Sequence, residues 1–331
     1  MVVAVCRRGV RYFKGFGRAG APAGDTLNDR TIFEIGSVTK AFTGIVLAKL
    51  VVDGSVQLDD PISLYLPEGV AGPKKFGREI TLKDLAVHTS GLPRLPDGFL
   101  AAVKNPQNPY ADYTTRNLYD DLGRATLKTE PGKQSVYSNF GYALLGKLLE
   151  LKSRKSYETL IRELLCDPLA MSNTTTRLSE EQKRFLTPGH GPNGVVVPGW
   201  DQDAMAPAGA IRSDAEDMLK LIEANFTTNE SAISKALQEA CTLRFSETGS
   251  AVNGLGLGWR IEALSPDNGP VVHWRNGGTG GYVCFVGFDK QQQTGVVVLS
   301  NYGDAFSRDA SVDRIGKELL ANSSSASLGQ L

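Results

Sequence analysis

Residues 36–52 read Gly36-Ser37-Val38-Thr39-Lys40-Ala41-Phe42-Thr43-Gly44-Ile45-Val46-Leu47-Ala48-Lys49-Leu50-Val51-Val52, and Asp53-Gly54 follows. Apart from its two lysines, this segment is small or apolar nearly all round, which is typical of a helix buried on most sides. Serine suits the start of a helix, and glycine suits the position just after its end. We therefore predict a buried helix over Ser37–Val52.

Strand patterns lie on both sides of this helix, at the two ends of the chain. β-branched and aromatic residues bounded by glycine predict a hairpin near the start and further strands after about residue 242. The predicted strands are Val2–Cys6, Val10–Phe16, Gly256–Ile261, Val271–Arg275, Tyr282–Phe288 and Gly295–Ser300, followed by a helix over Ser311–Ala321 and a Ser-rich tail that we expect to fray.

The middle of the chain carries helical patterns separated by Pro/Gly loops. They cover Leu82–Val87, Phe140–Lys152, Tyr157–Leu165 and Asp214–Asn225. Together with the terminal strands they predict an α+β fold. Residues 1–55 and 241–331 would build an antiparallel sheet from both chain termini, flanked by helices, and residues 56–240 would form a mostly helical inserted domain.

Composition excludes several classes of protein. The 331 residues include 36 Lys+Arg and 36 Asp+Glu, so the formal net charge is zero and no broad basic field invites nucleic acid. No apolar run reaches the roughly 18 residues of a membrane span. The four cysteines, Cys6, Cys166, Cys241 and Cys284, are scattered without a CxxC pair, so we expect buried thiols, not a zinc site or a disulfide framework.

Localisation and oligomeric state stay open at this level. The segment Met1–Arg8 is too short and has its basic residues on the wrong side for a signal peptide. The protein would be periplasmic or secreted if a leader was removed, and cytoplasmic if Met1 is the native start.

The most specific local feature is Ser37 with Lys40 three residues later, at the start of the predicted helix. Residues three apart share one helix face, so a lysine with a lowered pKa could act as base for a serine nucleophile. Free N–H groups at the helix start could stabilise an oxyanion. The alternative is a capping serine followed by an exposed lysine.

Two further motifs could complete a site. Tyr137-Ser138-Asn139 precedes the predicted helix Phe140–Lys152, where a tyrosine with a lowered pKa could relay protons and an amide could bind substrate; the alternative is a helix cap beside a packed aromatic. In Val271–Tyr282 a strand runs into a glycine-rich turn, where an extended peptide-like substrate could approach the backbone. The alternative is an ordinary hairpin turn.

Taken in order, these motifs resemble the serine β-lactamase-related family, which includes class C β-lactamases, low-molecular-weight penicillin-binding proteins and β-lactamase-like esterases. Ser37-Val38-Thr39-Lys40 matches the S-x-x-K motif, Tyr137-Ser138-Asn139 the second motif, and Arg275-Asn276-Gly277 stands in the K-T-G place. The resemblance runs from about Val2 to Asn301. Supporting stretches are 33–36, 88–93, 167–171, 209–213 and 278–282.

The resemblance implies a mechanism and a role for each matching residue. Ser37 would attack a carbonyl while Lys40 and Tyr137 exchange its proton, and the backbone N–H groups of Ser37 and Gly278 would form the oxyanion hole. Substrate would contact Asn139, Arg275, Asn276, Gly277 and Thr279. Neither a metal nor an organic cofactor is implied.

Arg275 is the chief departure, because the class C pattern has lysine there, and Asn276 replaces threonine. Arginine cannot act as a base, but it can bind a carboxylate and lower the pKa of Tyr137. His273, two residues earlier on the same strand face, is a further candidate, whereas His88 is expected to order a loop. The family's helix before the first strand has no counterpart here, so part of one sheet face should be uncovered or covered by a neighbouring chain.

Three functions remain open from the sequence. The first is a serine hydrolase that forms a covalent acyl-enzyme with β-lactams or D-alanyl peptides. The second is a carboxylesterase with the same catalytic residues, favoured by the change at Arg275 and Asn276. The third is a catalytically silent binding protein, against which the intact Ser37, Lys40 and Tyr137 argue.

Overall fold

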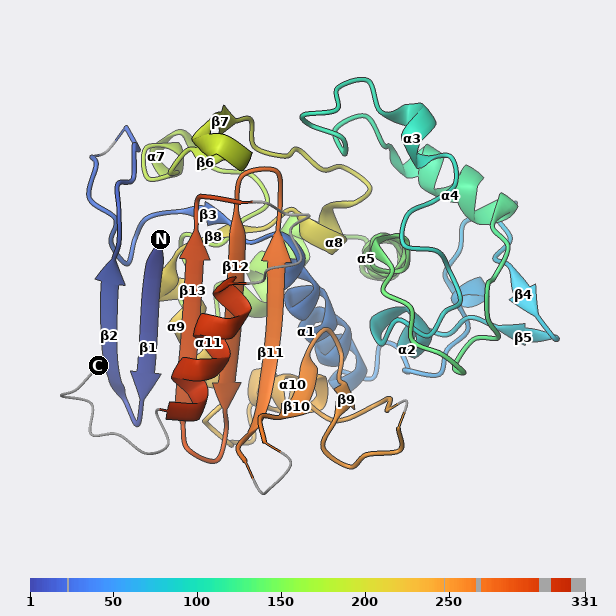
Figure 1. Ribbon diagram of the computed structural model, residues 1–331. Helices are drawn as coiled ribbons and strands as arrows, with labels where there is room; N and C mark the ends of the chain where they lie inside the picture. Colours follow the sequence, from blue (N-terminus) through green and yellow to red (C-terminus); the bar gives the residue numbers. More distant parts are fainter. Residues whose placement is uncertain (23, 247, 266–268, 304–310, 323–331) are drawn as a thin grey trace.

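The computed structural model describes residues 1–22, 24–246, 248–265, 269–303 and 311–322. Its main element is a seven-stranded sheet in which every neighbouring pair is antiparallel, in the order β2-β1-β13-β12-β11-β10-β9 (Figure 1). The strands are β1 Val2–Arg7, β2 Val10–Gly15, β9 Gly254–Leu255, β10 Arg260–Ala263, β11 Val271–Gly278, β12 Val283–Asp289 and β13 Thr294–Ser300. The predicted Ser-rich tail lies outside the described residues.

The two chain ends meet within this sheet. β1 pairs with β13 from Val2 opposite Leu299 to Arg7 opposite Thr294. The prediction of an α+β fold with an antiparallel sheet built from both termini is confirmed.

Helices occupy most of the chain between the terminal strands. They are α1 Thr39–Val52, α2 Leu82–Ala86, α3 Phe99–Ala102, α4 Thr115–Arg124, α5 Asn139–Ser153, α6 Tyr157–Ile161, α7 Glu180–Lys183, α8 Ala206–Gly209, α9 Ala215–Ala224 and α10 Ala232–Ala240, with α11 Ser311–Asn322 after the sheet. Short helical turns lie at Gly36–Val38 (η1), Ile62–Leu64, Arg162–Cys166 and Pro192–Gly194. Three two-stranded ribbons join β3 Phe33–Glu34 to β8 Arg212–Ser213, β4 Lys74–Lys75 to β5 Arg78–Glu79, and β6 Gly189–His190 to β7 Val196–Val197.

Each face of the sheet packs on its own helices. In Figure 1, α11 crosses in front of β12 and β13, and α9 and α1 lie behind the sheet. The rear core is the larger, and α1 is its centre: eleven of its residues are buried, as its apolar sequence predicts. Because α9 and α10 also pack against β1, β13 and α1, the domain boundary at residue 241 stays a prediction.

One predicted strand is wrong. Residues 256–259 form the connection between β9 and β10, not part of a strand over Gly256–Ile261. Gly258 has φ +85°, and a Cβ there would lie 2.3 Å from the carbonyl oxygen of Lys40. This turn therefore needs glycine in order to pack closely against the first turn of α1.

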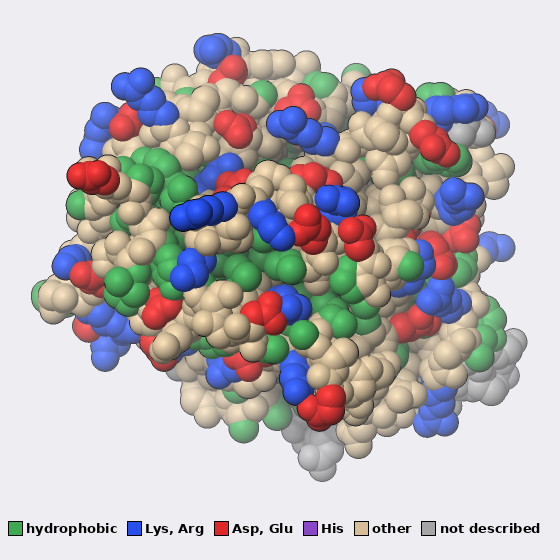
Figure 2. All heavy atoms as spheres, turned by 180° about the vertical axis from the view of Figure 1, so that it is seen from behind, with side chains coloured by type: hydrophobic (Ala, Val, Ile, Leu, Met, Phe, Trp, Pro, Cys, Tyr) green, Lys and Arg blue, Asp and Glu red, His purple; other side chains and the backbone are tan. Residues whose placement is uncertain are grey.

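The surface follows the balanced composition. Seen from behind, positive and negative side chains are interspersed over the face shown in Figure 2. Val10 and Tyr12 on the edge strand β2 are 47% and 46% exposed, so this part of the sheet is not covered within the described chain. No described helix is long and apolar enough to cross a membrane. All four cysteines are buried and free, as predicted.

Candidate active site

Ser37 lies in η1, a single helical turn between strand β3 and helix α1. Lys40 is the second residue of α1, and its Nζ donates to Ser37 Oγ over 3.2 Å and to the carbonyl oxygen of Ala208 over 2.6 Å. The lysine side chain is fully buried. The serine and lysine therefore meet as their spacing predicts, although the α-helix begins at Thr39, not at Ser37.

Tyr137 completes the cluster from the segment before α5. Its hydroxyl lies 2.6 Å from Ser37 Oγ, although 100 residues separate them in sequence. The next residue, Ser138, caps α5 by accepting from Gly141 N. The segment is held by His88, whose Nδ1 accepts from Ser138 N over 3.1 Å and whose carbonyl accepts from Val136 N. His88 thus orders a loop, as predicted.

Cations surround the Tyr137 ring. Lys40 Nζ, Arg94 Cζ and Arg275 Cζ lie 4.9, 5.0 and 5.3 Å from the ring centroid. Burial by itself would raise the pKa of Tyr137, but the charges of Lys40 and Arg275 outweigh it and lower the pKa to about 7. Burial, reinforced by Arg275, lowers the pKa of Lys40 to about 8. Near neutral pH, the ionised fraction of Tyr137 can therefore take a proton from Ser37, and so can the smaller uncharged fraction of Lys40.

The end of β11 packs directly behind the serine. A Cβ on Gly277 would lie 2.0 Å from the carbonyl oxygen of Ile35 and 2.8 Å from Ser37 N. Gly277 is therefore needed for close backbone approach and offers no side chain to a substrate. Gly278, the next residue, lines a small pocket together with Ser37 and Asn139.

Two residues predicted to bind substrate point elsewhere, and these predictions are corrected. Asn276 lies on the opposite face of β11, where its Nδ2 donates to Asp313 on α11 over 2.7 Å, because successive strand residues face opposite sides. The side chain of Thr279 is 1% exposed and buried beside Glu34.

His273 is also absent from the cluster. Its Nε2 lies 3.1 Å from the carbonyl oxygen of Cys241, and its ring stacks on Phe288. Burial lowers its pKa to about 4. It shares a strand face with Arg275 but lies further from η1, so it is a packed, neutral strand histidine.

Five residues of the Ser37 pocket were not identified from the sequence: Arg94, Tyr110, Trp200, Gln202 and Ala208. Arg94 directly follows the conspicuous stretch 88–93, which is the one signal that could have found it. Trp200 lies in an irregular loop whose position depends on a buried ion pair, Glu34 with Arg212 at 3.0 Å. Glu34 Oε1 accepts from Trp200 N, and Arg212 donates to the Trp200 carbonyl.

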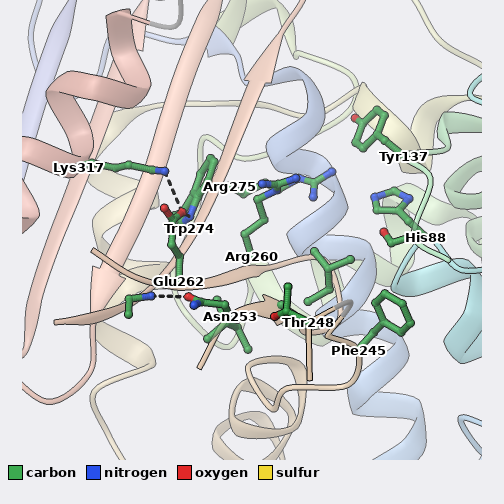
Figure 3. Close-up of a pocket in the computed structure, with 15 residues that line it drawn as sticks. His88, Tyr137, Phe245, Thr248, Asn253, Arg260, Glu262, Trp274, Arg275 and Lys317 are labelled. Carbon is green, nitrogen blue, oxygen red and sulfur yellow. Dashed lines mark hydrogen bonds and ion pairs between the residues drawn. The ribbon is translucent and has the colours of Figure 1, made fainter. Parts of the chain in front are cut away.

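A larger cleft of about 600 Å³ begins at Tyr137 and Arg275. It extends along β10 and β11 towards Lys317 (Figure 3), and Phe245, Thr248 and Asn253 line its outer part. β10 pairs with β11 only as far as Trp274, so no described strand pairs with Arg275–Gly278 on the side where β10 lies.

A buried lysine and a tyrosine on one serine hydroxyl define a serine hydrolase of the β-lactamase type. The sequence model of the Beta-lactamase family matches residues 1–320, and the chain belongs to this family. It is 31% identical over 313 residues to the D-alanyl-D-alanine-carboxypeptidase/endopeptidase AmpH of Escherichia coli (strain K12), covering 90% of this chain and 78% of the relative. It is 29% identical over 333 residues to a β-lactamase of the same organism, covering 91% and 83%.

A solved structure has the same fold as this chain. A β-lactamase/D-alanine carboxypeptidase from Yersinia pestis, complexed with citrate, superposes with a TM-score of 0.81 at 28% identity. The match covers 97% of this chain and 92% of that one. The resemblance inferred from the motifs is confirmed, together with its fold and its enzyme class.

Proposed function

We propose that this enzyme hydrolyses D-alanyl peptides or β-lactams through a covalent ester on Ser37. The observation that carries the proposal is the contact of Ser37 Oγ with both Tyr137 and Lys40, at 2.6 and 3.2 Å. The names of the relatives, a D-alanyl-D-alanine carboxypeptidase and β-lactamases, support this substrate class.

In the acylation step, Ser37 Oγ bonds to the carbonyl carbon and gives its proton to Tyr137, the nearer of the two bases. Lys40 and Arg275 stabilise the ionised tyrosine before this transfer. The carbon–nitrogen bond of the substrate then breaks, and the leaving nitrogen takes the proton. Water attacks the ester in the second step, releases the acid and returns a proton to Ser37.

The surrounding residues orient the substrate and stabilise its charge. Ser37 and Gly278 line the same pocket, and their backbone N–H groups would hold the oxyanion. Loss of one such donor typically costs about 3–4 kcal/mol of transition-state stabilisation. Asn139, in the same pocket, would bind the amide of the acyl part. Arg275 would bind the substrate carboxylate, because its Nη2 is buried without a hydrogen-bond partner in the described structure.

Three substrates test the proposal: a fluorescent penicillin, a chromogenic cephalosporin and a short-chain nitrophenyl ester, each with wild type and Ser37→Ala. Persistent labelling identifies a penicillin-binding protein, and cephalosporin turnover identifies a lactamase. Ester turnover alone would replace the proposal with a carboxylesterase. Equal behaviour of wild type and Ser37→Ala with all three would refute both enzymatic functions.

A further inference from the structure

The cleft beyond Tyr137 has more positive charge than one substrate carboxylate needs. Its charged lining side chains are Arg260, Arg275, Lys317 and Glu262. Lys317 donates to Glu262 over 2.8 Å, and the same carboxylate oxygen accepts from Trp274 Nε1, so these two charges neutralise each other. The two arginines therefore add two positive charges to the cleft, and ionisation of Tyr137, which also lines it, offsets one of them.

Within the described residues neither arginine forms a close ion pair with an aspartate or glutamate, although Arg260 interacts electrostatically with Asp313 on α11. Arg275 is 4% exposed, and apart from a 3.4 Å contact between its Nε and the Ser37 carbonyl oxygen, its guanidinium lies over the Tyr137 ring. Its Nη2 is buried and unpartnered. Arg260 comes from the neighbouring strand and lies over the ring of Trp274 at 5.4 Å. A buried cation such as Arg275 is costly unless a ligand supplies an anion, whereas Arg260 is exposed and open to a ligand.

The two side chains reach the same region from adjacent strands. Figure 3 shows Arg260 and Arg275 extending towards each other on the side that faces His88 and Tyr137. Burial and the nearby positive charges of Arg275, Lys40 and Arg260 lower the pKa of His88, so the histidine stays neutral and adds no charge. Two like charges in one open cleft indicate an anionic ligand that bridges them.

We propose that Arg260 forms a second anion-binding subsite, next to Arg275, for a leaving group that carries two carboxylates. This inference rests on the proposed function for its orientation: the acyl part lies at Asn139, so the leaving group enters the cleft that begins at Arg275. The substrate class is a peptide whose last residue has an acidic side chain. Its α-carboxylate binds Arg275, and its side-chain carboxylate binds Arg260.

Three thioesters with the same acyl group test the subsite. Their leaving thiols are ethanethiol, mercaptoacetate and mercaptosuccinate, which carry zero, one and two carboxylates, and thiol release is followed with a disulfide reagent. A charge-assisted hydrogen bond is worth about tenfold or more in kcat/KM. We expect wild type to prefer two carboxylates to one by about this factor. Arg260→Gln should abolish that preference, and Arg260→Lys should retain part of it.

The control is Arg116→Gln, which removes an arginine whose side chain is 90% exposed on α4, outside the cleft. It should keep the wild-type preference. Equal kcat/KM for one and two carboxylates in wild type would overturn the subsite. Arg260→Gln slowing all three thioesters by the same factor would do so too, because it would mean that Arg260 only supports the strand through Trp274.

Binding separates this inference from the proposed function. In Ser37→Ala, calorimetry compares free mercaptosuccinate with free mercaptoacetate. The dicarboxylate should bind about tenfold tighter, and adding Arg260→Gln should remove the difference. If wild type turns over no thioester, that result counts against the proposed catalytic function only, and tighter dicarboxylate binding still supports the subsite. Binding no tighter than the monocarboxylate refutes it.

Discussion

Replacing Arg275 by glutamine should move the acid limb of the pH–rate profile to higher pH. Arg275 Cζ lies 5.3 Å from the centroid of the Tyr137 ring, over which the phenolate charge is spread. At an effective dielectric constant of about 20, this pair attracts by about 3 kcal/mol, or about a hundredfold in the ionisation equilibrium. Because the pKa of Tyr137 is about 7, wild-type activity should be half-maximal near neutral pH.

The assay is kcat/KM from about pH 5 to 9.5, since this quantity reports groups of the free enzyme. A neutral nitrophenyl ester serves as substrate, because it has no carboxylate whose binding Arg275 could alter. Arg275→Gln should lose up to about a hundredfold below pH 7 and recover at high pH. Arg275→Lys keeps the charge, so its kcat/KM should fall at nearly the same acidic pH as that of wild type. If kcat/KM falls at the same acidic pH in Arg275→Gln and in wild type, the assignment of Tyr137 as the base is refuted.

Three further changes test the site and its support. Ser37→Ala should abolish covalent labelling by fluorescent penicillin while leaving the melting temperature within a few degrees. Gly277→Ala should lower the urea unfolding free energy by about 1–3 kcal/mol and impair turnover, because its Cβ would overlap the Ile35 carbonyl; Gly123→Ala, with open space around it, should not. Burial and the nearby Asp217 raise the pKa of Asp214 from 3.8 to about 7, so the fold retains a proton that the unfolded chain loses. Urea unfolding should therefore show stability falling as pH rises from about 4 to 7, and Asp214→Asn should flatten that fall.

Local sequence patterns predicted much of the fold. The hairpin at the N-terminus and the apolar helix α1 follow from short-range alternation and from the absence of a polar face. The segment 256–259 resembles a strand because the apolar residues Leu257 and Trp259 alternate with glycines. What decides its shape is the backbone of Lys40 lying against Gly258, a contact that no local pattern contains.

The candidate site likewise contains residues that local spacing identifies and residues that only tertiary contacts place. Ser37 and Lys40 could be paired from their spacing, since one helical turn brings them together. Asn276 could not be assigned correctly, because its side-chain direction depends on how β11 pairs with β12 and on which face α11 covers. Trp200 had no signal at all, because it reaches the pocket through the buried Glu34–Arg212 pair.

Short-range spacing within the sequence thus predicted the candidate nucleophile Ser37 and its lysine, and the order of the motifs along the chain indicated the family to which it belongs. Only the tertiary structure decided that Tyr137 lies 2.6 Å from Ser37 and that Arg275 lies over its ring. It also decided that two arginines share one cleft. The reason is physical: pKa values and charge pairing depend on burial and on distances between segments a hundred or more residues apart, which packing alone sets.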